Sequence, residues 1–375
     1  NKKSKIITTY MNKKINTQTI LSKTGIEMSR NSVISKKYQK KSHLEHIKER
    51  PDTYIGSCEK RTECLWVMDG EKMVHRDVTF VPGFLKIFDE ILVNAADNKR
   101  RDSSMKSIKV TICNDRISVE NDGQGIPVVM HETEKMYVPQ MVFGELLSGD
   151  NYDDSSDRVV GGRNGYGAKL ANIFSTIFCV ETIDSKAGKK YSQSWHRNMS
   201  KVDTPVIKSS GKRKDFTRIT FSPDYVKFGL EGMTDDILSL FRKRVYDLAG
   251  TTPHDVIVYL NGERLPVRNF KQYCSLYFQD ETKMIYEKIN DRWEVCVTVS
   301  QDQQAQQVSF CNAICTTGGG EHVRYILDEI ARRVLPHRSL KDLNVRASLV
   351  KLSTFVFVNA LITNPSFDSQ TKEKL

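Results

Sequence analysis

Apolar residues recur at helical spacing after Pro82 and predict a helix with one face packed against a core. These apolar positions are Phe84, Ile87, Phe88, Ile91 and Ala95. Polar residues occupy another side of the same helix: at about 3.6 residues per turn, Glu90, Asn94 and Asp97 fall within an arc of roughly 60°. The pattern therefore predicts an apolar stripe that anchors the helix and a polar stripe that is available for chemistry.

Alternating apolar and polar residues predict strands along much of the chain. Residues 108–112 and 116–120 alternate, and Asn114-Asp115 can turn between them, which predicts a β-hairpin. Further strands are predicted at residues 178–183, 190–195, 217–221, 255–260, 293–300, 306–314 and 354–361. Helices are predicted at residues 42–49 and 138–147, through Lys169 and Ile173, from the capping residue Thr234 to Gly250, and at residues 321–335. We find no internal repeat and expect a domain boundary near residue 268.

Charge is distributed unevenly. Residues 1–50 carry 13 Lys or Arg against 3 Asp or Glu, whereas the remaining 325 residues carry 44 against 43, so the net charge of +11 belongs almost entirely to the N-terminal segment. A basic tail on a neutral body is typical of proteins that work near nucleic acid, and a solvated disordered tail is the alternative explanation. No run of 18 apolar residues occurs, which argues against a membrane span.

The cysteines give no sign of a disulfide framework or a zinc site. Eight of them are scattered without a Cys-x-x-Cys pair, and no His or Cys lies near Cys311 and Cys315 at zinc spacing. We expect buried free thiols in a reducing compartment.

A glycine-rich segment, Gly-Gly-Arg-Asn-Gly-Tyr-Gly-Ala-Lys at residues 161–169, is the strongest candidate for anion binding. Glycines that open a helix expose backbone N–H groups and a helix N-terminus to phosphate oxygens. The glycine order is the reverse of the dinucleotide fingerprint, and Leu170 stands where a P-loop carries a hydroxyl. Taken alone, the segment fits a structural turn as well as a phosphate site. Together with the polar residues 148–158 before it, it predicts a mobile lid.

Two further pieces accompany the glycine segment. Glu90 followed one turn later by Asn94 offers a base for water and an oxygen ligand for a hard metal ion, although most such pairs are only a polar helix face. Asn121-Asp-Gly-Gln-Gly125 follows a predicted strand, where Asn121 can meet a base edge and the glycines let backbone approach a flat ring; a tight turn is the simpler alternative.

In this order the three pieces resemble the GHKL (Bergerat-fold) ATPases. Residues 50–56, 88–97, 136–139, 151–154 and 161–170, with Asn364-Pro-Ser-Phe-Asp-Ser-Gln-Thr-Lys372, are similar to the ATPase region of eukaryotic DNA topoisomerase II, a type IIA family. The resemblance runs from about Val33 to the C-terminus. It implies an α+β fold with a GHKL ATPase sandwich followed by a ribosomal-protein-like transducer domain. The implied divisions are a basic tail and arm at residues 1–35, the ATPase domain at 36–268 and a truncated transducer at 269–375.

The resemblance also implies roles for individual residues. Glu90 is the expected general base, Asn94 the ligand of Mg²⁺, and Lys372 the cation that neutralises the γ-phosphate of ATP. The remaining expected ATP contacts are Asn121, Gly149, Asp150, Asn151, Gly162, Arg163, Asn164, Gly165, Tyr166, Gly167, Ala168, Lys169, Gln370, Thr371 and, from the partner subunit's copy of the arm, Tyr38. Gly149 and Asp150 depart from the two serines usual in eukaryotic relatives, which puts ribose contacts there in doubt. Basic residues expected to meet DNA phosphates are Arg332, Arg333, Arg338, Lys341, Arg346 and Lys351, with a solvated helix face as the alternative.

The implied function is the upper gate of a topoisomerase II, closed by ATP-driven dimerisation around a DNA duplex and reset by hydrolysis. Its partners would be double-stranded DNA, a second copy of the chain and the DNA cleavage core of the same enzyme, in the nucleus unless the source is viral or organellar. Nothing resembles the TOPRIM metal site or a catalytic tyrosine, so ATP hydrolysis without DNA cleavage is expected. The rivals are a GHKL chaperone or mismatch-repair ATPase, a histidine kinase and a non-enzymatic nucleotide-binding scaffold.

Overall fold

The computed structural model describes residues 33–149, 159–160, 162, 165–211, 214–278, 283–300, 304–337 and 345–375. The chain forms two compact units, residues 1–46 and 47–375. In the smaller unit, residues 33–37 are helical and exposed, and α2 (His43–Glu49) begins there. All elements discussed below belong to the larger unit.

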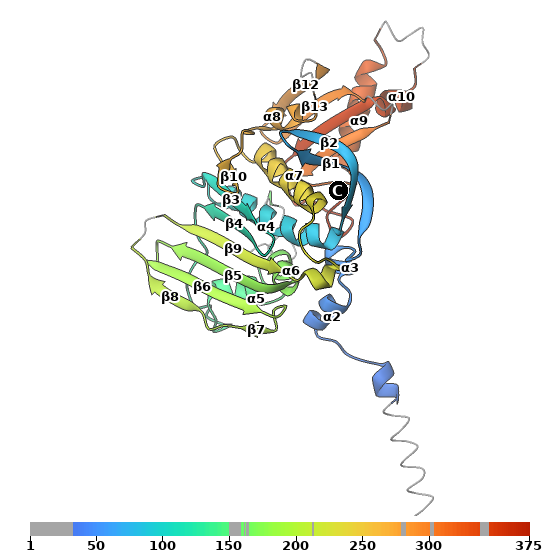
Figure 1. The fold of residues 1–375 in the computed structure, drawn as a ribbon. Helices are drawn as coiled ribbons and strands as arrows, with labels where there is room; N and C mark the ends of the chain where they lie inside the picture. The colour runs from blue at the N-terminus through green and yellow to red at the C-terminus, as the bar shows by residue number, and fades with distance from the viewer. Residues whose placement is uncertain are drawn as a thin grey trace, which may run out of the picture. The chain divides into compact units, whose positions relative to one another are not determined.

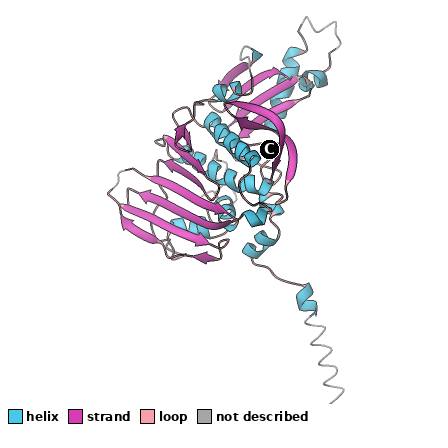
Figure 2. Ribbon diagram, viewed as in Figure 1, coloured by secondary structure: helices cyan, strands magenta, loops and turns pink. Residues whose placement is uncertain are grey.

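A nine-stranded sheet forms the first part of the larger unit (Figures 1 and 2). Its strands run in the order β11-β10-β3-β4-β9-β5-β6-β7, and β8 also pairs with β6. Their bounds are β3 Ser107–Ile112, β4 Ile117–Asp122, β5 Ser175–Asp184, β6 Lys189–His196, β7 Lys201–Val202, β8 Val206–Ser209, β9 Phe216–Pro223, β10 Ile257–Leu260 and β11 Glu263–Arg264. Most pairs are antiparallel, but β10 runs parallel to β3, which makes the sheet mixed.

Helices cover one face of this sheet. Contact with its strands is made by α4 (Pro82–Arg101), α5 (Val138–Gly144) and α6 (Gly167–Ile173), and α7 (Asp235–Thr251) packs against α4. The apolar stripe predicted for α4 is buried, with Phe84, Ile87 and Phe88 at 0% exposure. Phe88 stacks on Phe241 of α7 at a centroid distance of 4.1 Å. The stripe therefore fixes α4 between the sheet and α7, which determines where its polar side points.

A five-stranded sheet forms the second part, in the order β12-β13-β16-β14-β15. Its strands are β12 Ile285–Asn290, β13 Trp293–Val299, β14 Gln306–Cys311, β15 Ile314–Cys315 and β16 Thr354–Ala360. The parallel strands β14 and β16 are connected through α9 (Glu321–Val334) and α10 (Ala347–Leu352), so the expected βαβ unit is present. Val323 and Ile326 of α9 pack on Val356 and Val358 of β16 in a buried cluster.

A hairpin that the sequence analysis did not predict joins the two sheets. Strands β1 (Arg61–Asp69) and β2 (Lys72–Phe80) pair with each other and pack on α7, while Trp66 stacks on Phe355 of β16 at 5.7 Å. The short α3 (Asp52–Ile55), the 3-10 turn η1 (Tyr225–Phe228) and α8 (Phe270–Ser275) were also not predicted.

The predicted start of α7 is confirmed, and its predicted end is wrong. The Thr234 hydroxyl accepts a hydrogen bond from the N–H of Ile237, which caps the helix. Gly250 does not end the helix, because α7 continues to Thr251. A Cβ built at Gly250 would lie 2.5 Å from Cβ of Tyr273 in α8. The glycine is thus required by close packing of two helices.

Gly250→Ala is expected to destabilise the fold by about 2 kcal/mol, because overpacking against Tyr273 outweighs the better helix propensity of alanine. Urea unfolding at constant pH measures the difference. Gly211→Ala is the control, since a Cβ built at Gly211 meets no described atom within 4 Å apart from those of the glycine and its chain neighbours. Equal stability of the Gly250→Ala variant and the parent would contradict the packing explanation.

The cysteine prediction is confirmed in part. All eight thiols are free, and Cys274, Cys296 and Cys311 are buried. Cys64 and Cys113 are exposed, contrary to the expectation of burial. Within the described ranges, no helix combines the length and hydropathy that crossing a bilayer would take.

Candidate active site

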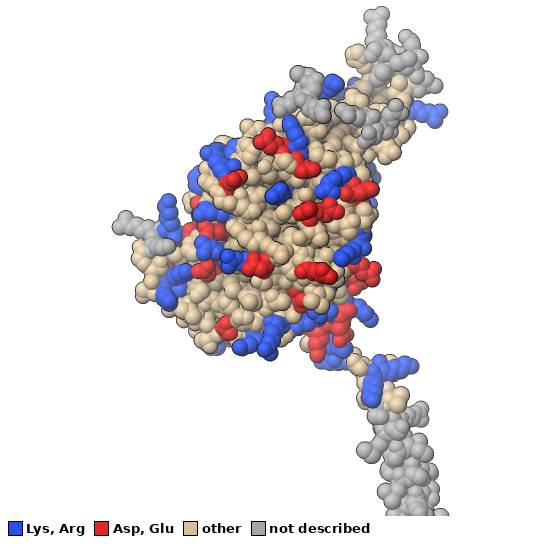
Figure 3. All heavy atoms as spheres, viewed as in Figure 1, with Lys and Arg blue, Asp and Glu red and all other residues tan. Residues whose placement is uncertain are grey.

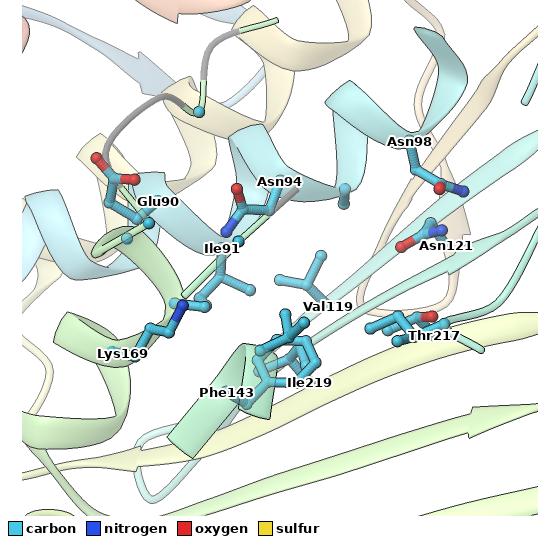
Figure 4. Close-up of a pocket in the computed structure, with 18 of the residues that line it drawn as sticks. Glu90, Ile91, Asn94, Asn98, Val119, Asn121, Phe143, Lys169, Thr217 and Ile219 are labelled. Atoms are coloured by element: carbon cyan, nitrogen blue, oxygen red, sulfur yellow. The ribbon is translucent and has the colours of Figure 1, made fainter. Parts of the chain in front are cut away.

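A cavity of about 460 Å³ lies between the helical layer and the nine-stranded sheet. It is lined by α4, β4, α5, α6, β9 and the C-terminal segment around residues 370–372. Figure 4 shows Glu90 at one end, Asn121 and Thr217 at the other, and Asn94 between them. Segments that are far apart in the sequence therefore contribute to one site.

One end of the cavity contains a buried carboxylate between two lysines. Glu90 is 3% exposed; its Oε1 lies 2.8 Å from Nζ of Lys86 and 3.1 Å from Nζ of Lys372. Burial alone would raise the pKa of the Glu90 carboxyl, but the charges and hydrogen bonds of Lys372 and Lys86 outweigh it and lower the pKa to about 2. Glu90 is therefore ionised near neutral pH. Because the folded pKa is depressed, this group stabilises the fold above its ordinary value of 4.5 and loses that contribution as the pH falls toward 2.

The glycine segment forms the wall next to Glu90. Gly162, Gly165, Tyr166, Gly167, Ala168 and Lys169 all line the cavity. The N–H of Gly162 donates to Oδ2 of Asp97 at 3.0 Å, so the third residue of the polar stripe on α4 anchors this segment. Nζ of Lys169 donates to the carbonyl of Ser148 at 2.5 Å, which ties α6 to the segment after α5.

The opposite end of the cavity is apolar with a few polar groups. Val119, Phe143 and Ile219 present apolar surface, and Asn121 and Thr217 lie beside them (Figure 4). Asn121 is 7% exposed, and its amide donates to the carbonyl of Asp122 at 3.0 Å. A flat apolar group with a polar edge fits such an end, while the basic and glycine-rich end suits an anion.

The structure brings most of the predicted site residues together. Glu90, Asn94, Asn121, Gly149, Gln370 and Lys372 line the same cavity as the glycine segment. Thr371 is not among the residues that line it, and its hydroxyl hydrogen-bonds with that of Ser369 at 2.7 Å. Asp150, Asn151, Arg163 and Asn164 lie outside the described residues. Tyr38 belongs to the smaller unit, where it is 72% exposed.

The predicted basic residues of the second part are only partly described. Arg332 and Arg333 are exposed at the end of α9 and pair with Glu329, and Lys351 of α10 pairs with Asp328. Arg346 is exposed, while Arg338 and Lys341 lie outside the described residues. On the visible face of the larger unit, basic and acidic side chains are interspersed (Figure 3).

Sequence reasoning missed Lys86 and the apolar end of the cavity. Lys86 is 7% exposed and lies one helical turn before Glu90, and this spacing could have identified it as a partner. Thr217 and Ile219 sit on a predicted strand, but only the pairing of β9 with β4 reveals that they face the cavity.

Comparisons with known proteins agree with this geometry. Two family descriptions match the chain: histidine kinase-, DNA gyrase B-, and HSP90-like ATPase over residues 82–223, and DNA gyrase B over residues 255–375. DNA topoisomerase 2 of Arabidopsis thaliana is 51% identical over 354 residues, which cover 91% of this chain and 24% of the relative. DNA topoisomerase 2 of Bombyx mori is 52% identical over 361 residues, which cover 91% of this chain and 23% of that relative. The chain thus spans about a quarter of the length of these curated relatives.

Solved structures extend the similarity to the fold. The crystal structure of the ATPase region of Saccharomyces cerevisiae topoisomerase II is 51% identical with a TM-score of 0.87, covering 91% of this chain and 90% of that chain. The 43K ATPase domain of Thermus thermophilus gyrase B is 21% identical with a TM-score of 0.56, and the match covers 88% of this chain and 84% of that chain. This second similarity supports the fold alone. The chain therefore belongs to the eukaryotic DNA topoisomerase II family and corresponds to its ATPase region.

Proposed function

We propose that this chain binds and hydrolyses ATP in the cavity around Glu90, and that ATP binding closes the upper gate of a type IIA topoisomerase. The observation that carries the proposal is the contact between Glu90 of α4 and Lys372, which are 282 residues apart in sequence and share one buried site. A carboxylate and a cation from opposite parts of the chain match what phosphoryl transfer requires, namely an oriented water and neutralised charge.

The two ends of the cavity suggest how the nucleotide lies. Adenine fits the apolar end, with Asn121 at its polar edge, and the phosphates fit the glycine segment near Lys372. Gln370 lines the same cavity, whereas we assign Thr371 only a supporting role, since its hydroxyl bonds to Ser369. Gly149 lines the cavity next to Ser148, whose carbonyl accepts from Lys169, and we assign Gly149 backbone contact only.

Asn94 is the residue that would hold Mg²⁺. Its side chain points into the cavity, and it makes no hydrogen bond to any part of the chain that the structure describes, so its amide oxygen is available to a hard cation. When bound, the ion would offset the negative charge of the phosphates.

Glu90 would act on water as a general base. Lys372 and Lys86 hold the pKa of Glu90 at about 2, which makes it a weak base. Transfer of Lys372 from the carboxylate to the γ-phosphate removes one of those two cations. The pKa of Glu90 then rises, so the base becomes stronger when the substrate is in place. Lys86 remains and keeps the carboxylate oriented.

Lys372 would also link the nucleotide to the arrangement of the chain. We propose a basic tail and arm over residues 1–35, an ATPase domain over residues 36–268 and a transducer over 269–375. Tyr38, just after the arm, would reach the partner's nucleotide. Loss of the γ-phosphate on hydrolysis removes the contact of Lys372, which would release the closed gate. A second copy of the chain, double-stranded DNA and the cleavage core of the same enzyme are the proposed partners, in the nucleus. Exposed Arg332, Arg333 and Arg346 would contact DNA phosphates.

A phosphate-release assay combined with sedimentation tests this function. The chain should release phosphate from ATP in a saturable, Mg²⁺-dependent reaction, and a non-hydrolysable ATP analogue should convert monomers into dimers. Absence of both would overturn the proposal. A dimer without hydrolysis would indicate the nucleotide-binding scaffold instead. Chaperone and mismatch-repair ATPases are not favoured, because the similar proteins are topoisomerases over nine-tenths of the chain.

Gly167→Ala is expected to reduce ATP hydrolysis about 100-fold without preventing folding. A Cβ built at Gly167 would lie 2.1 Å from Oε2 of Glu90, so the base must leave its position between the two lysines. A misplacement of about 1 Å costs roughly this much rate. Steady-state phosphate release measures the effect, with Gly211→Ala as the control. Unchanged turnover in the Gly167→Ala variant would argue against Glu90 as the base.

A further inference from the structure

The turn between β14 and β15 does not line the cavity, but it hydrogen-bonds the backbone of segments that lead to it. Asn312 and Ala313 form this turn with φ values of 52° and 65°. The sequence analysis predicted one continuous strand over residues 306–314, and the structure corrects this: β14 ends at Cys311 and the chain reverses. Asn312 is 4% exposed, so its amide lies away from solvent.

The side chain of Asn312 bridges two segments that approach the cavity from different directions. Its Oδ1 accepts from the N–H of Ile362 at 2.9 Å, and its Nδ2 donates to the carbonyl of Ile362 at 2.9 Å. The same Nδ2 donates to the carbonyl of Val160 at 3.2 Å. Val160 immediately precedes the glycine segment, and Ile362 begins the segment that ends at Lys372.

The other residue of the turn is linked through Arg244 of α7 to α4, the helix that carries Glu90. The carbonyl of Ala313 accepts from Nη2 of Arg244 at 3.5 Å, and Nε of Arg244 donates to Asp89 at 2.8 Å. Asp89 is adjacent to Glu90. One two-residue turn is therefore hydrogen-bonded, directly or through Arg244, to all three parts of the site.

We propose that Asn312 is a positioning residue that holds the glycine segment in register with the lysine-bearing segment. It touches no atom of the cavity's expected ligand and acts through Val160 and Ile362. Only an asparagine supplies two N–H donors and an acceptor oxygen on a side chain of this length, and asparagine tolerates a positive φ. The inference rests on the proposed function, because register matters only if one ligand contacts both segments.

The hydrogen bonds of Asn312 to Val160 and Ile362 control discrimination between ATP and ADP. The glycine segment alone can bind a diphosphate, whereas a triphosphate also engages Lys372. Loss of these hydrogen bonds weakens binding of the triphosphate and leaves the affinity for the diphosphate nearly unchanged. A purely structural role of Asn312 would lower both affinities together, or only the melting temperature.

The experiment measures the dissociation constants of ADP and of a non-hydrolysable ATP analogue for the 375-residue chain by calorimetry with Mg²⁺. Asn312→Asp keeps the shape and the acceptor for Ile362 but removes both donor bonds. Asn312→Gly removes the side chain without adding charge and keeps the turn conformation, so it carries the test if the aspartate variant does not fold. Both variants should lower the preference for the triphosphate analogue over ADP by about tenfold, with less than about a twofold change for ADP.

Asn261→Gly is the matched control. Asn261 also has a positive φ of 50° in a two-residue turn, and its Oδ1 ties a neighbouring strand by accepting from the N–H of Ile112 at 2.8 Å. It lies outside the cavity lining, so it should leave the nucleotide preference unchanged. An unchanged preference in the Asn312 variants, or an equal change in the Asn261→Gly variant, overturns the inference. Failure of the parent chain to bind either nucleotide would instead refute the proposed function.

Discussion

Replacement of Glu90 by glutamine is expected to lower the rate of ATP hydrolysis by about 10²- to 10³-fold while nucleotide binding persists. Glutamine keeps the length and one acceptor of the side chain but cannot take a proton from water. Phosphate release under saturating ATP and Mg²⁺ measures the rate, and binding of a non-hydrolysable analogue supplies the control. Equal turnover in variant and parent would remove Glu90 from the mechanism.

The Glu90→Gln variant should also be less stable than the parent when no nucleotide is added. Lys86 and Lys372 are both buried beside Glu90, and glutamine leaves two cations without a counter-charge. Removal of one member of a buried ion pair costs about 3 kcal/mol. We therefore expect a lower melting temperature that a bound triphosphate partly restores, because its charge pairs with Lys372.

Replacement of Lys372 by alanine is expected to abolish most ATP-dependent dimerisation and to reduce hydrolysis by about 10²-fold. The variant lacks the only cation that the C-terminal segment, as described, places beside Glu90. Binding of ADP should change little, since a diphosphate lacks the group that Lys372 would contact. Light scattering with and without the ATP analogue measures the dimer.

Lys374→Ala is the control for the Lys372 variant, because Lys374 is exposed in the same segment and does not line the cavity. It should behave as the parent. Full dimerisation of the Lys372→Ala variant with the analogue would contradict the role of this lysine in coupling nucleotide to closure. Loss of dimerisation in both variants would point to the segment as a whole rather than to one ammonium group.

The first helix of the site could be predicted from local sequence because its two stripes obey the helical period. The apolar stripe from Phe84 to Ala95 is buried, and Glu90 and Asn94 line the cavity as their spacing indicated. Lys86 was missed although its partner, Glu90, lies four residues later on the same helix, a spacing that could have identified the pair. Local periodicity carries no information about Lys372, which only the resemblance identified.

The elements that were missed or wrongly bounded have different physical causes. The β1–β2 hairpin carries many polar residues and gains its stability from packing on α7, although its turn at Gly70, with a φ of 59°, was a usable signal. The turn at Asn312 and Ala313 contains no glycine, so the strand before it was predicted to continue. Gly250 illustrates the reverse error, in which a glycine required for helix packing was interpreted as a helix end.

The site explains how one nucleotide could control two sheets. Glu90 and Asn94 belong to the helical layer of the first sheet, whereas Lys372 follows the last strand of the second. The Glu90–Lys372 ion pair links the two parts. A γ-phosphate would take over the contact of Lys372, while Glu90 would hold the attacking water, and the contact with Lys372 would last until hydrolysis.

A crystal structure of the chain with Mg²⁺ and a non-hydrolysable ATP analogue tests this central claim most directly. We predict the triphosphate in the cavity, with Nζ of Lys372 at hydrogen-bond distance from the γ-phosphate and the Glu90 carboxylate at hydrogen-bond distance from a water beside the same phosphorus. A nucleotide bound elsewhere, or one bound in the cavity while Lys372 stays paired with Glu90 and away from the phosphates, would contradict it.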